Sequence, residues 1–286
     1  MLQFSTVMAI AAHARRCRYA YGIAAWLAVG TACIAAEELR IGGAGTVIGT
    51  MREIGDAYTK ASPDVTVNVL PSLGAAGGVT ALLSGAVDIA MATRPLTEAD
   101  RVKEVQTIEI ARIPFVFAVA ANSRVVNVTS RQLLEIYQAR LVTWPDGSRI
   151  RLVLRPPSVS DTMFLKDLSP DWKKAMDQLE ARPGMLVVAT AQEAADRVEN
   201  TPGAITTSTI NLIVTEKRAM KALHVGGVEP NARTVADGSY PYYKPVIVVT
   251  LPRPSAPVQK FVAFVRSKTG RDILVRTGHV VVGDGR

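Results

Sequence analysis

Short apolar runs alternate with amphipathic stretches along most of the chain. β-Branched runs bounded by glycine or proline predict buried parallel strands over 38–43, 65–70, 87–92, 149–154, 185–190 and 245–250. A spacing of about 3.6 residues predicts helices over 47–62, 76–85, 130–139, 171–181, 191–199 and 256–267. This alternation indicates an α/β fold whose helices cover both faces of a sheet.

Two segments are predicted to cross between lobes. The apolar run at 112–123 opens at a proline, and 237–249 has prolines on both sides of its aromatic residues. If both segments join the same two lobes, the first lobe is discontinuous and comprises 37–115 and 245–286, and the second comprises 116–244. A cleft between two α/β lobes is a common place for a small-ligand site.

The first 36 residues predict a secretory signal peptide. A basic region precedes an apolar stretch that ends in small residues, with cleavage expected near Ala35 or Ala36. A membrane-spanning anchor is the alternative, although the stretch is short for one. Cys33 suggests a lipidation site, but Gly30 stands where a large aliphatic residue is expected. We therefore expect a periplasmic protein, exported rather than lipidated.

Removing this segment changes the composition of the chain. Both cysteines, Cys17 and Cys33, are lost with it, so no disulfide is expected. The net charge of +8 falls by the three arginines of the segment and stays modestly positive, which favours small anions. The remaining basic residues are scattered, so nucleic acid is not an expected partner. We expect a soluble protein, since no second stretch is long and apolar enough to span a bilayer. We also expect it to be a monomer.

Small and polar residues gather where predicted strands meet predicted helices. The loop GGAGTVIGT (42–50) lacks the Gly-Lys-Ser/Thr of a Walker loop and the third glycine of a dinucleotide fingerprint. It is interpreted as a tight turn with Thr46 as N-cap, and an anion at its free amides is a plausible addition. A second glycine-rich loop opens at 71–85.

Two arginines and several hydroxyls end other strands. Thr93 and Arg94 follow one strand, and Arg155 follows another. Ser160 is expected to cap the next helix, although the triplet Ser160, Asp161 and Thr162 also suits an ordinary first turn. Ligands of doubly wound folds lie at such strand ends. The joint occurrence of two arginines and several hydroxyls at these strand ends favours an anion site.

Catalytic patterns are sparse in the sequence. There is no GxSxG, no HExxH and no metal-ligand spacing, and His224 and His279 have no acid or cysteine cluster nearby. We expect no catalytic residue, metal or cofactor, and a binding protein rather than an enzyme.

Several longer segments carry a family resemblance. GGAGTVIGTMREIGDAY, LGAAGGVTALLSGAVDIAMATRPL, IYQARLVTWPDG, GVEPNARTVADGSYPYYKPV and VQKFVAFVRSKTGRDILVRTGHVVV occur in this order. They resemble the periplasmic phosphate-binding proteins of ABC transporters, which are type 2 periplasmic binding proteins. The resemblance covers nearly all of the chain after the signal.

The resemblance implies two lobes that close on an oxyanion, and a transporter permease as partner. Amides, hydroxyls and arginine would hold the anion through charge-assisted hydrogen bonds. Carried over by position, the ligand-binding residues are Thr46, Val47, Thr93, Arg94, Arg155, Ser160 and Thr162.

Two positions depart from the family pattern. Ala76 stands where the family has a serine hydroxyl, which would cost about 1–3 kcal/mol if a ligand oxygen stays unpaired. Asp161 replaces a glycine and places a carboxylate in the site. This acid either accepts the proton that phosphate carries and sulfate lacks, or is neutralised by Arg155, or points to solvent, or marks a different ligand.

The sequence therefore predicts an exported solute-binding protein that delivers phosphate or a related oxyanion to an ABC transporter. A diverged binding protein used for sensing, with another small anionic ligand, is the first alternative. A nucleotide-dependent enzyme on an α/β fold is the second, and the incomplete dinucleotide fingerprint argues against it.

Overall fold

The computed structural model describes residues 37–97 and 104–283. The predicted signal peptide, with Cys17 and Cys33, lies outside the described residues. The strands are β1 Glu37–Gly43, β2 Val65–Val69, β3 Ile89–Ala92, β4 Gln106–Ala120, β5 Asn127–Val128, β6 Arg151–Leu154, β7 Leu186–Val187, β8 Ala204–Thr209, β9 Met220–Ala222, β10 His224–Val225, β11 Tyr243–Thr250 and β12 Val280–Val281. The helices are α1 Ile48–Ala61, α2 Gly74–Leu83, α4 Ser130–Tyr137, α5 Ser160–Leu168, α6 Pro170–Glu180, α7 Ala191–Asn200, α8 Ile210–Thr215, α9 Ala232–Ala236, α10 Ala256–Arg266 and α11 Lys268–Arg276, with a 3-10 turn η1 at Gly45–Val47.

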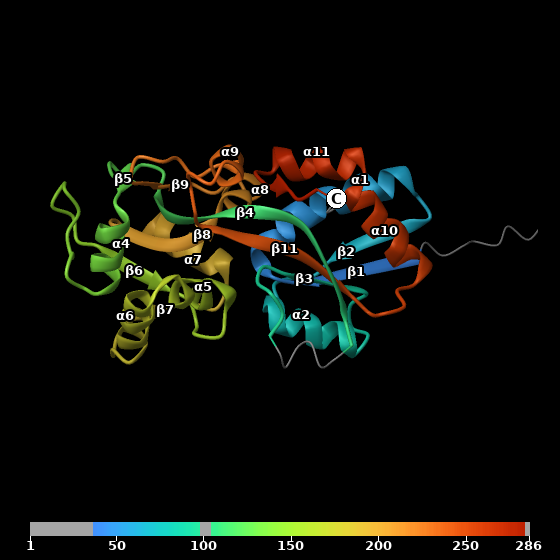
Figure 1. Ribbon diagram of the computed structural model, residues 1–286, viewed down its shortest axis with the longest axis horizontal. Helices are drawn as coiled ribbons and strands as arrows, with labels where there is room; N and C mark the ends of the chain where they lie inside the picture. The colour runs from blue at the N-terminus through green and yellow to red at the C-terminus, as the bar shows by residue number, and fades with distance from the viewer. Residues whose placement is uncertain (1–36, 98–103, 284–286) are drawn as a thin grey trace, which may run out of the picture. The chain divides into compact units, whose positions relative to one another are not determined.

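One mixed sheet runs through the described part of the chain, in the order β2-β1-β3-β11-β4-β8-β6-β7 (Figure 1). Strands β9 and β12 also pair with β4, and β5 and β10 form a separate parallel pair. Strand β4 is the common element. Its first part, to Pro114, pairs with β11, and its second part, from Phe115, pairs with β8.

Helices cover both faces of each half of this sheet (Figure 1). In the half built on β1, β3 and β11, helices α1, α10 and α11 pack on one face and α2 packs on the other. In the half built on β6 and β8, helices α4, α5 and α6 share one core, and α7 and α8 share the core on the opposite face. Alternate residues of β4 enter the last two cores: Phe115, Phe117 and Val119 face one, and Val116 and Ala118 face the other.

The α/β class and most predicted elements are confirmed. The six predicted helices lie within about two residues of those observed, as element ends usually allow. The predicted strand at 185–190 shortens to the two residues of β7. The expectation of parallel strands holds for β1, β2, β3, β6 and β7 but is wrong for β11, which is antiparallel to both β3 and β4.

No helix within 37–97 or 104–283 is long and apolar enough to cross a membrane.

Candidate functional site

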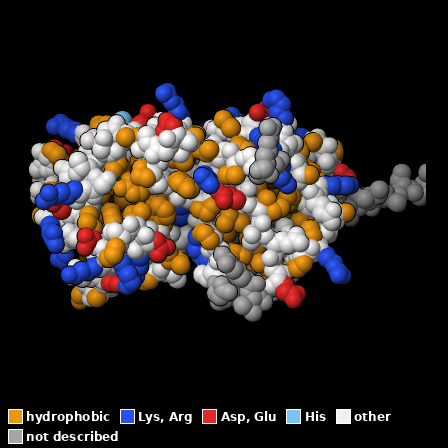
Figure 2. Space-filling model, in the orientation of Figure 1, with side chains coloured by type: hydrophobic (Ala, Val, Ile, Leu, Met, Phe, Trp, Pro, Cys, Tyr) orange, Lys and Arg blue, Asp and Glu red, His pale blue; other side chains and the backbone are white. Residues whose placement is uncertain are grey.

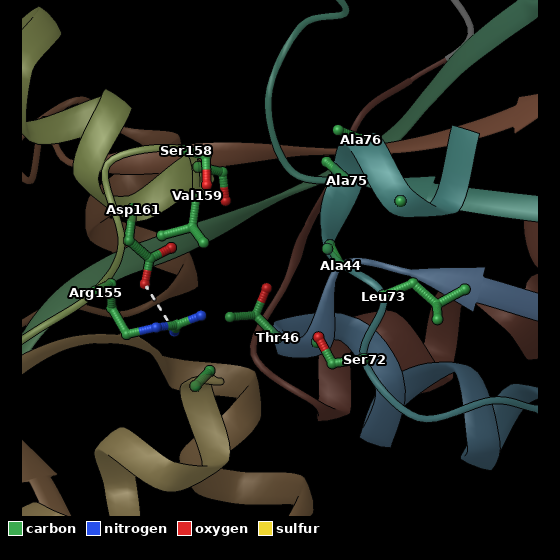
Figure 3. Close-up of a pocket in the computed structure, with 15 residues that line it drawn as sticks. Ala44, Thr46, Ser72, Leu73, Ala75, Ala76, Arg155, Ser158, Val159 and Asp161 are labelled. Atoms are coloured by element: carbon green, nitrogen blue, oxygen red, sulfur yellow. Dashed lines mark ion pairs between the residues drawn. The ribbon is translucent and has the colours of Figure 1, made fainter. Parts of the chain in front are cut away.

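A cavity of about 260 Å³ lies where the two halves of the sheet meet (Figure 3). One wall comes from residues 44–46, which follow β1, and residues 72–77, which open α2. The facing wall comes from Arg155, from residues 158–161 at the start of α5, and from Ala191. Both walls are formed by chain segments that lead from a strand into a helix, as the sequence predicts for the ligand site.

Helix α7, whose first residue Ala191 lines the cavity, is capped by the hydroxyl of Thr190. The other helix starts at or beside the cavity lack side-chain caps. The N-caps are Ala44 for η1, Val47 for α1, Leu73 for α2 and Val159 for α5, and none of these side chains accepts a capping hydrogen bond. The predictions of Thr46 and Ser160 as N-caps are therefore wrong. First-turn amides have no acceptor within their own helix, so uncapped helix starts suit an anion.

Two glycines bring α2 close to the strand that precedes the first wall. A Cβ on Gly78 would lie 2.6 Å from the Cα of Gly43, and Gly43 itself has φ +125°. Neither position tolerates a side chain without a shift of backbone. This close contact places the start of α2 beside residues 44–46.

The guanidinium of Arg155 is fixed at the cavity by hydrogen bonds to two backbone carbonyls. Its Nε donates to the carbonyl of Val188 at 3.2 Å and one terminal nitrogen donates to the carbonyl of Ala189 at 3.0 Å. The other terminal nitrogen, Nη1, is buried, has no hydrogen-bond partner, and lies 3.8 Å from Oδ2 of Asp161 (Figure 3). Burial lowers the pKa of Arg155, and the charges of Asp161 and Glu193 oppose that shift. The guanidinium thus carries its charge at the cavity with one donor unused.

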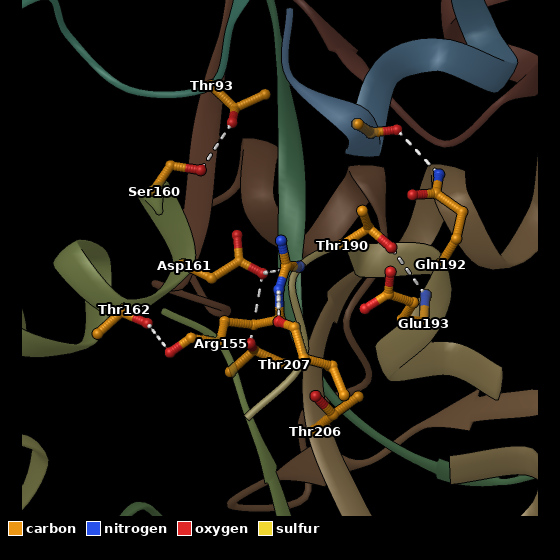
Figure 4. A network of polar contacts seen from close by, with 12 residues as sticks. Thr93, Arg155, Ser160, Asp161, Thr162, Thr190, Gln192, Glu193, Thr206 and Thr207 are labelled. Atoms are coloured by element: carbon orange, nitrogen blue, oxygen red, sulfur yellow. Dashed lines mark hydrogen bonds and ion pairs between the residues drawn. The ribbon is translucent and has the colours of Figure 1, made fainter. Parts of the chain in front are cut away.

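Asp161 is buried, so the hypothesis that it points to solvent is wrong. Its Oδ1 accepts a hydrogen bond from Nζ of Lys244. Its Oδ2 accepts one from the hydroxyl of Thr207 at 3.3 Å (Figure 4). Burial would raise the pKa of this carboxyl, but the charges of Lys244 and Arg155 and these hydrogen bonds outweigh it and lower the pKa. Asp161 is therefore held as a carboxylate.

Ser160 connects three elements at the edge of the cavity. Its hydroxyl accepts a hydrogen bond from Nζ of Lys244 at 2.8 Å. The same hydroxyl lies 3.1 Å from the hydroxyl of Thr93 (Figure 4). Thr93 itself does not line the cavity. A second polar contact joins the two halves of the molecule beside the cavity, where Nε2 of Gln192 donates to the carbonyl of Gly45 at 3.3 Å.

The hydroxyl of Thr46 is buried at the cavity and has no hydrogen-bond partner within the described chain. The backbone of Thr46 is fixed, because its carbonyl accepts from Nδ2 of Asn211 at 2.5 Å. A buried hydroxyl without a partner is unfavourable unless a ligand or water satisfies it. Thr46 and Arg155 thus each bring an unsatisfied donor to the same cavity, from opposite walls.

The structure brings together part of the predicted set. Thr46, Ala76, Arg155, Ser160 and Asp161 line the cavity. The other four predicted residues lie elsewhere: Val47 packs in the core under α1, Thr93 bonds to Ser160, Arg94 donates to the carbonyl of Pro95, and the hydroxyl of Thr162 donates to the carbonyl of Arg155.

Lys244 and Gln192 were missed by the sequence analysis. Lys244 interrupts an apolar segment, PYYKPVIVV, and a charged residue inside a buried strand was the available signal. Gln192 lies in a polar helix start and carries no such signal.

The described residues show no group of three or more histidine, cysteine or acidic side chains placed to hold a metal ion. The cavity offers unpartnered hydrogen-bond donors and the guanidinium of Arg155, an arrangement that suits binding of an anion.

Known proteins are similar to this chain in sequence. Residues 28–269 match the PBP superfamily domain. The chain is 23% identical over 83% of its length to the phosphate-binding protein PstS of Borreliella burgdorferi, covering 88% of that protein. It is 22% identical over 87% of its length to the PstS of Bacillus subtilis, covering 82% of it.

Solved structures show the same fold. A Clostridium perfringens substrate-binding protein of a phosphate ABC transporter, solved with bound phosphate, superposes with a TM-score of 0.75 at 20% identity, over 86% of this chain and all of that one. The reduced OxyR of N. meningitidis superposes with a TM-score of 0.59 at 12% identity, over 86% and 99% of the two chains. With the domain match spanning most of its residues, the chain belongs to the PBP superfamily.

Proposed function

We propose that this chain is an exported solute-binding protein that captures phosphate or a related oxyanion in the cavity and delivers it to an ABC transporter. The observation that carries the proposal is the pair of buried, unpartnered donors, the Thr46 hydroxyl and Nη1 of Arg155, on opposite walls of one cavity. An oxyanion between them would satisfy both and would meet the amides of the uncapped helix starts.

The relatives support phosphate as the ion. Two PstS proteins that align over most of their length are named for phosphate binding, and the Clostridium perfringens protein was solved with phosphate. The periplasmic location and the permease partner follow from the same relationship and from the predicted signal segment. A binding role agrees with the unpartnered donors of Thr46 and Arg155 at the cavity.

The lobe boundaries belong to this proposal. We assign 37–115 and 245–286 to lobe I and 116–244 to lobe II. In support, β4 exchanges its partner between Pro114 and Phe115, from β11 to β8. The hydrophobic cores divide at about the same place.

Calorimetric titration of the purified protein with phosphate, sulfate and molybdate at two pH values tests the function. We expect saturable heat with phosphate at one ion per chain. Absence of heat with all three ions at both pH values would rule out the oxyanion-binding function.

A further inference from the structure

Lys244 is a buried charge that the anion site does not use directly. Among the lysines, arginines, aspartates and glutamates that the structure describes, only Lys244 and Asp161 are buried. Lys244 lies near the start of β11 and does not line the cavity; it stands behind Ser160 and Asp161, which do. A buried ammonium group is costly unless it is paired, so its position calls for a reason.

The hydrogen-bond partners of Lys244 both belong to the cavity wall. Its Nζ donates to Oδ1 of Asp161 and to the hydroxyl of Ser160, and it lies 5.4 Å from the ring centre of Phe115. Both polar partners belong to the first turn of α5, whereas Lys244 comes from β11. The lysine thus ties the start of α5 to the central strands of the sheet.

The position of Asp161 shows the effect of its contact with Lys244. Oδ2 of Asp161 lies 3.8 Å from Nη1 of Arg155, within ion-pair range but beyond hydrogen-bond range, and Nη1 has no hydrogen-bond partner. The carboxylate is engaged by Lys244 on one oxygen and by Thr207 on the other. Arg155, Lys244 and Asp161 together carry a net charge of about +1, and the Arg155 donor stays available.

We propose that Lys244 is a positioning residue for anion binding: it neutralises and holds Asp161, so that Arg155 is left for the oxyanion. This inference rests on the proposed oxyanion-binding function. Without Lys244, the charge of Asp161 would be balanced by Arg155 alone, the net charge of the group would fall to zero, and the carboxylate would compete with the ligand for Arg155. The acid is then a fixed counter-charge rather than the acceptor of the ligand's proton.

Phosphate titrations of four proteins test this inference: the unaltered chain, Lys244→Met, Lys244→Met with Asp161→Asn, and Lys166→Met as a control. Lys166 also bridges two carboxylates, those of Asp177 and Glu180, but at the far end of α5. We expect Lys244→Met to weaken phosphate binding by about tenfold or more, because it leaves a buried carboxylate unpaired beside Arg155. The phosphate affinity of the double variant should lie within about threefold of that of the unaltered protein. The affinity of Lys166→Met should equal that of the unaltered protein.

The double variant keeps the test decisive even if Lys244→Met does not fold, because it removes both buried charges together. A folded double variant that binds phosphate about tenfold or more weakly would overturn the inference. So would a Lys244→Met protein that binds as well as the unaltered chain. If the unaltered chain itself bound no phosphate, the proposed function would fail, and the inference would fall with it.

The pH dependence separates positioning from a purely structural role. The charged or titratable groups that face the pair are Arg155, Arg94 and Tyr137, with Glu193 next to Arg155. In Lys244→Met, burial would raise the pKa of Asp161, so that the carboxylate takes up a proton and loses its charge as the pH falls. Lowering the pH from 8 to 5 should therefore reduce the difference in phosphate affinity between Lys244→Met and the unaltered protein. A difference in affinity that stays constant from pH 8 to pH 5 would overturn the inference.

Discussion

The two walls of the cavity offer an anion different chemistry. The wall from residues 44–46 and 72–77 contains no charged side chain and presents helix-start amides and hydroxyls. The wall from Arg155 and residues 158–161 carries an arginine whose side chain is only 9% exposed and a buried acid. Neutral donors need only local backbone geometry, whereas buried charges need partners from β8, β11 and the loop before α7. Binding strength is therefore expected to be concentrated on the charged wall.

Arg155 and Arg94 give the sharpest contrast, because both end strands in the sequence. Arg155→Ala should weaken phosphate binding by about a hundredfold or more, since it removes the charge at the cavity and its charge-assisted hydrogen bonds. Arg94→Ala should change affinity by no more than about threefold, because Arg94 lies outside the cavity lining. Calorimetric titration with phosphate measures the affinity of both variants. Similar losses of affinity would contradict the difference that we expect between the two arginines.

Acid should remove the contribution of Asp161, on the charged wall, to the stability of the fold. The pKa of Asp161 is below that of the unfolded chain, about 3.9, so its ionised form stabilises the fold above that pH. This contribution is lost as the pH falls through the lower, folded pKa. Urea unfolding between pH 7 and pH 3 should show a shallower acid-side fall for Asp161→Asn, starting from a stability about 3 kcal/mol lower at neutral pH because Lys244 is left unpaired. If the free energy of unfolding fell equally with pH in both proteins, ionised Asp161 would not be the stabilising group.

On the neutral wall, Thr46→Val should separate binding from stability. The Thr46 hydroxyl has no partner in the protein, so its loss should leave the free energy of unfolding unchanged or slightly raised. Phosphate affinity should nevertheless fall by about tenfold, the worth of one hydrogen bond to a charged group. Thr46→Ser, which keeps the hydroxyl, is the control. Equal affinity for Thr46→Val would show that the hydroxyl does not meet the ligand.

The smallest effect is expected from adding a donor to the neutral wall. Ala76→Ser places a hydroxyl at the cavity and should strengthen phosphate binding about three- to tenfold. Ala81→Ser on the same helix, away from the cavity, is the matched control. No gain for Ala76→Ser would mean that the second glycine-rich loop contributes amides only.

Sequence reasoning found the elements that have clear apolar patterns. It missed β8, because its residues TTST (206–209) are hydroxyl-bearing yet buried, and it did not join 106–120 into one strand, because Pro114 interrupts the run. For the site, the strand-end rule placed Arg155, Ser160 and Asp161 at the cavity. It could not supply Lys244, because the contact between β11 and α5 joins residues more than eighty positions apart.

Strand β4 has a consequence for how the chain folds. Its fifteen residues supply side chains to the core under α1, to the core under α5 and to the core under α7. At the exchange of partners, the amide of Phe115 donates to Tyr242 and its carbonyl accepts from Tyr240. Neither half can complete its sheet without this strand, so the two halves should gain and lose structure together, in a single cooperative transition.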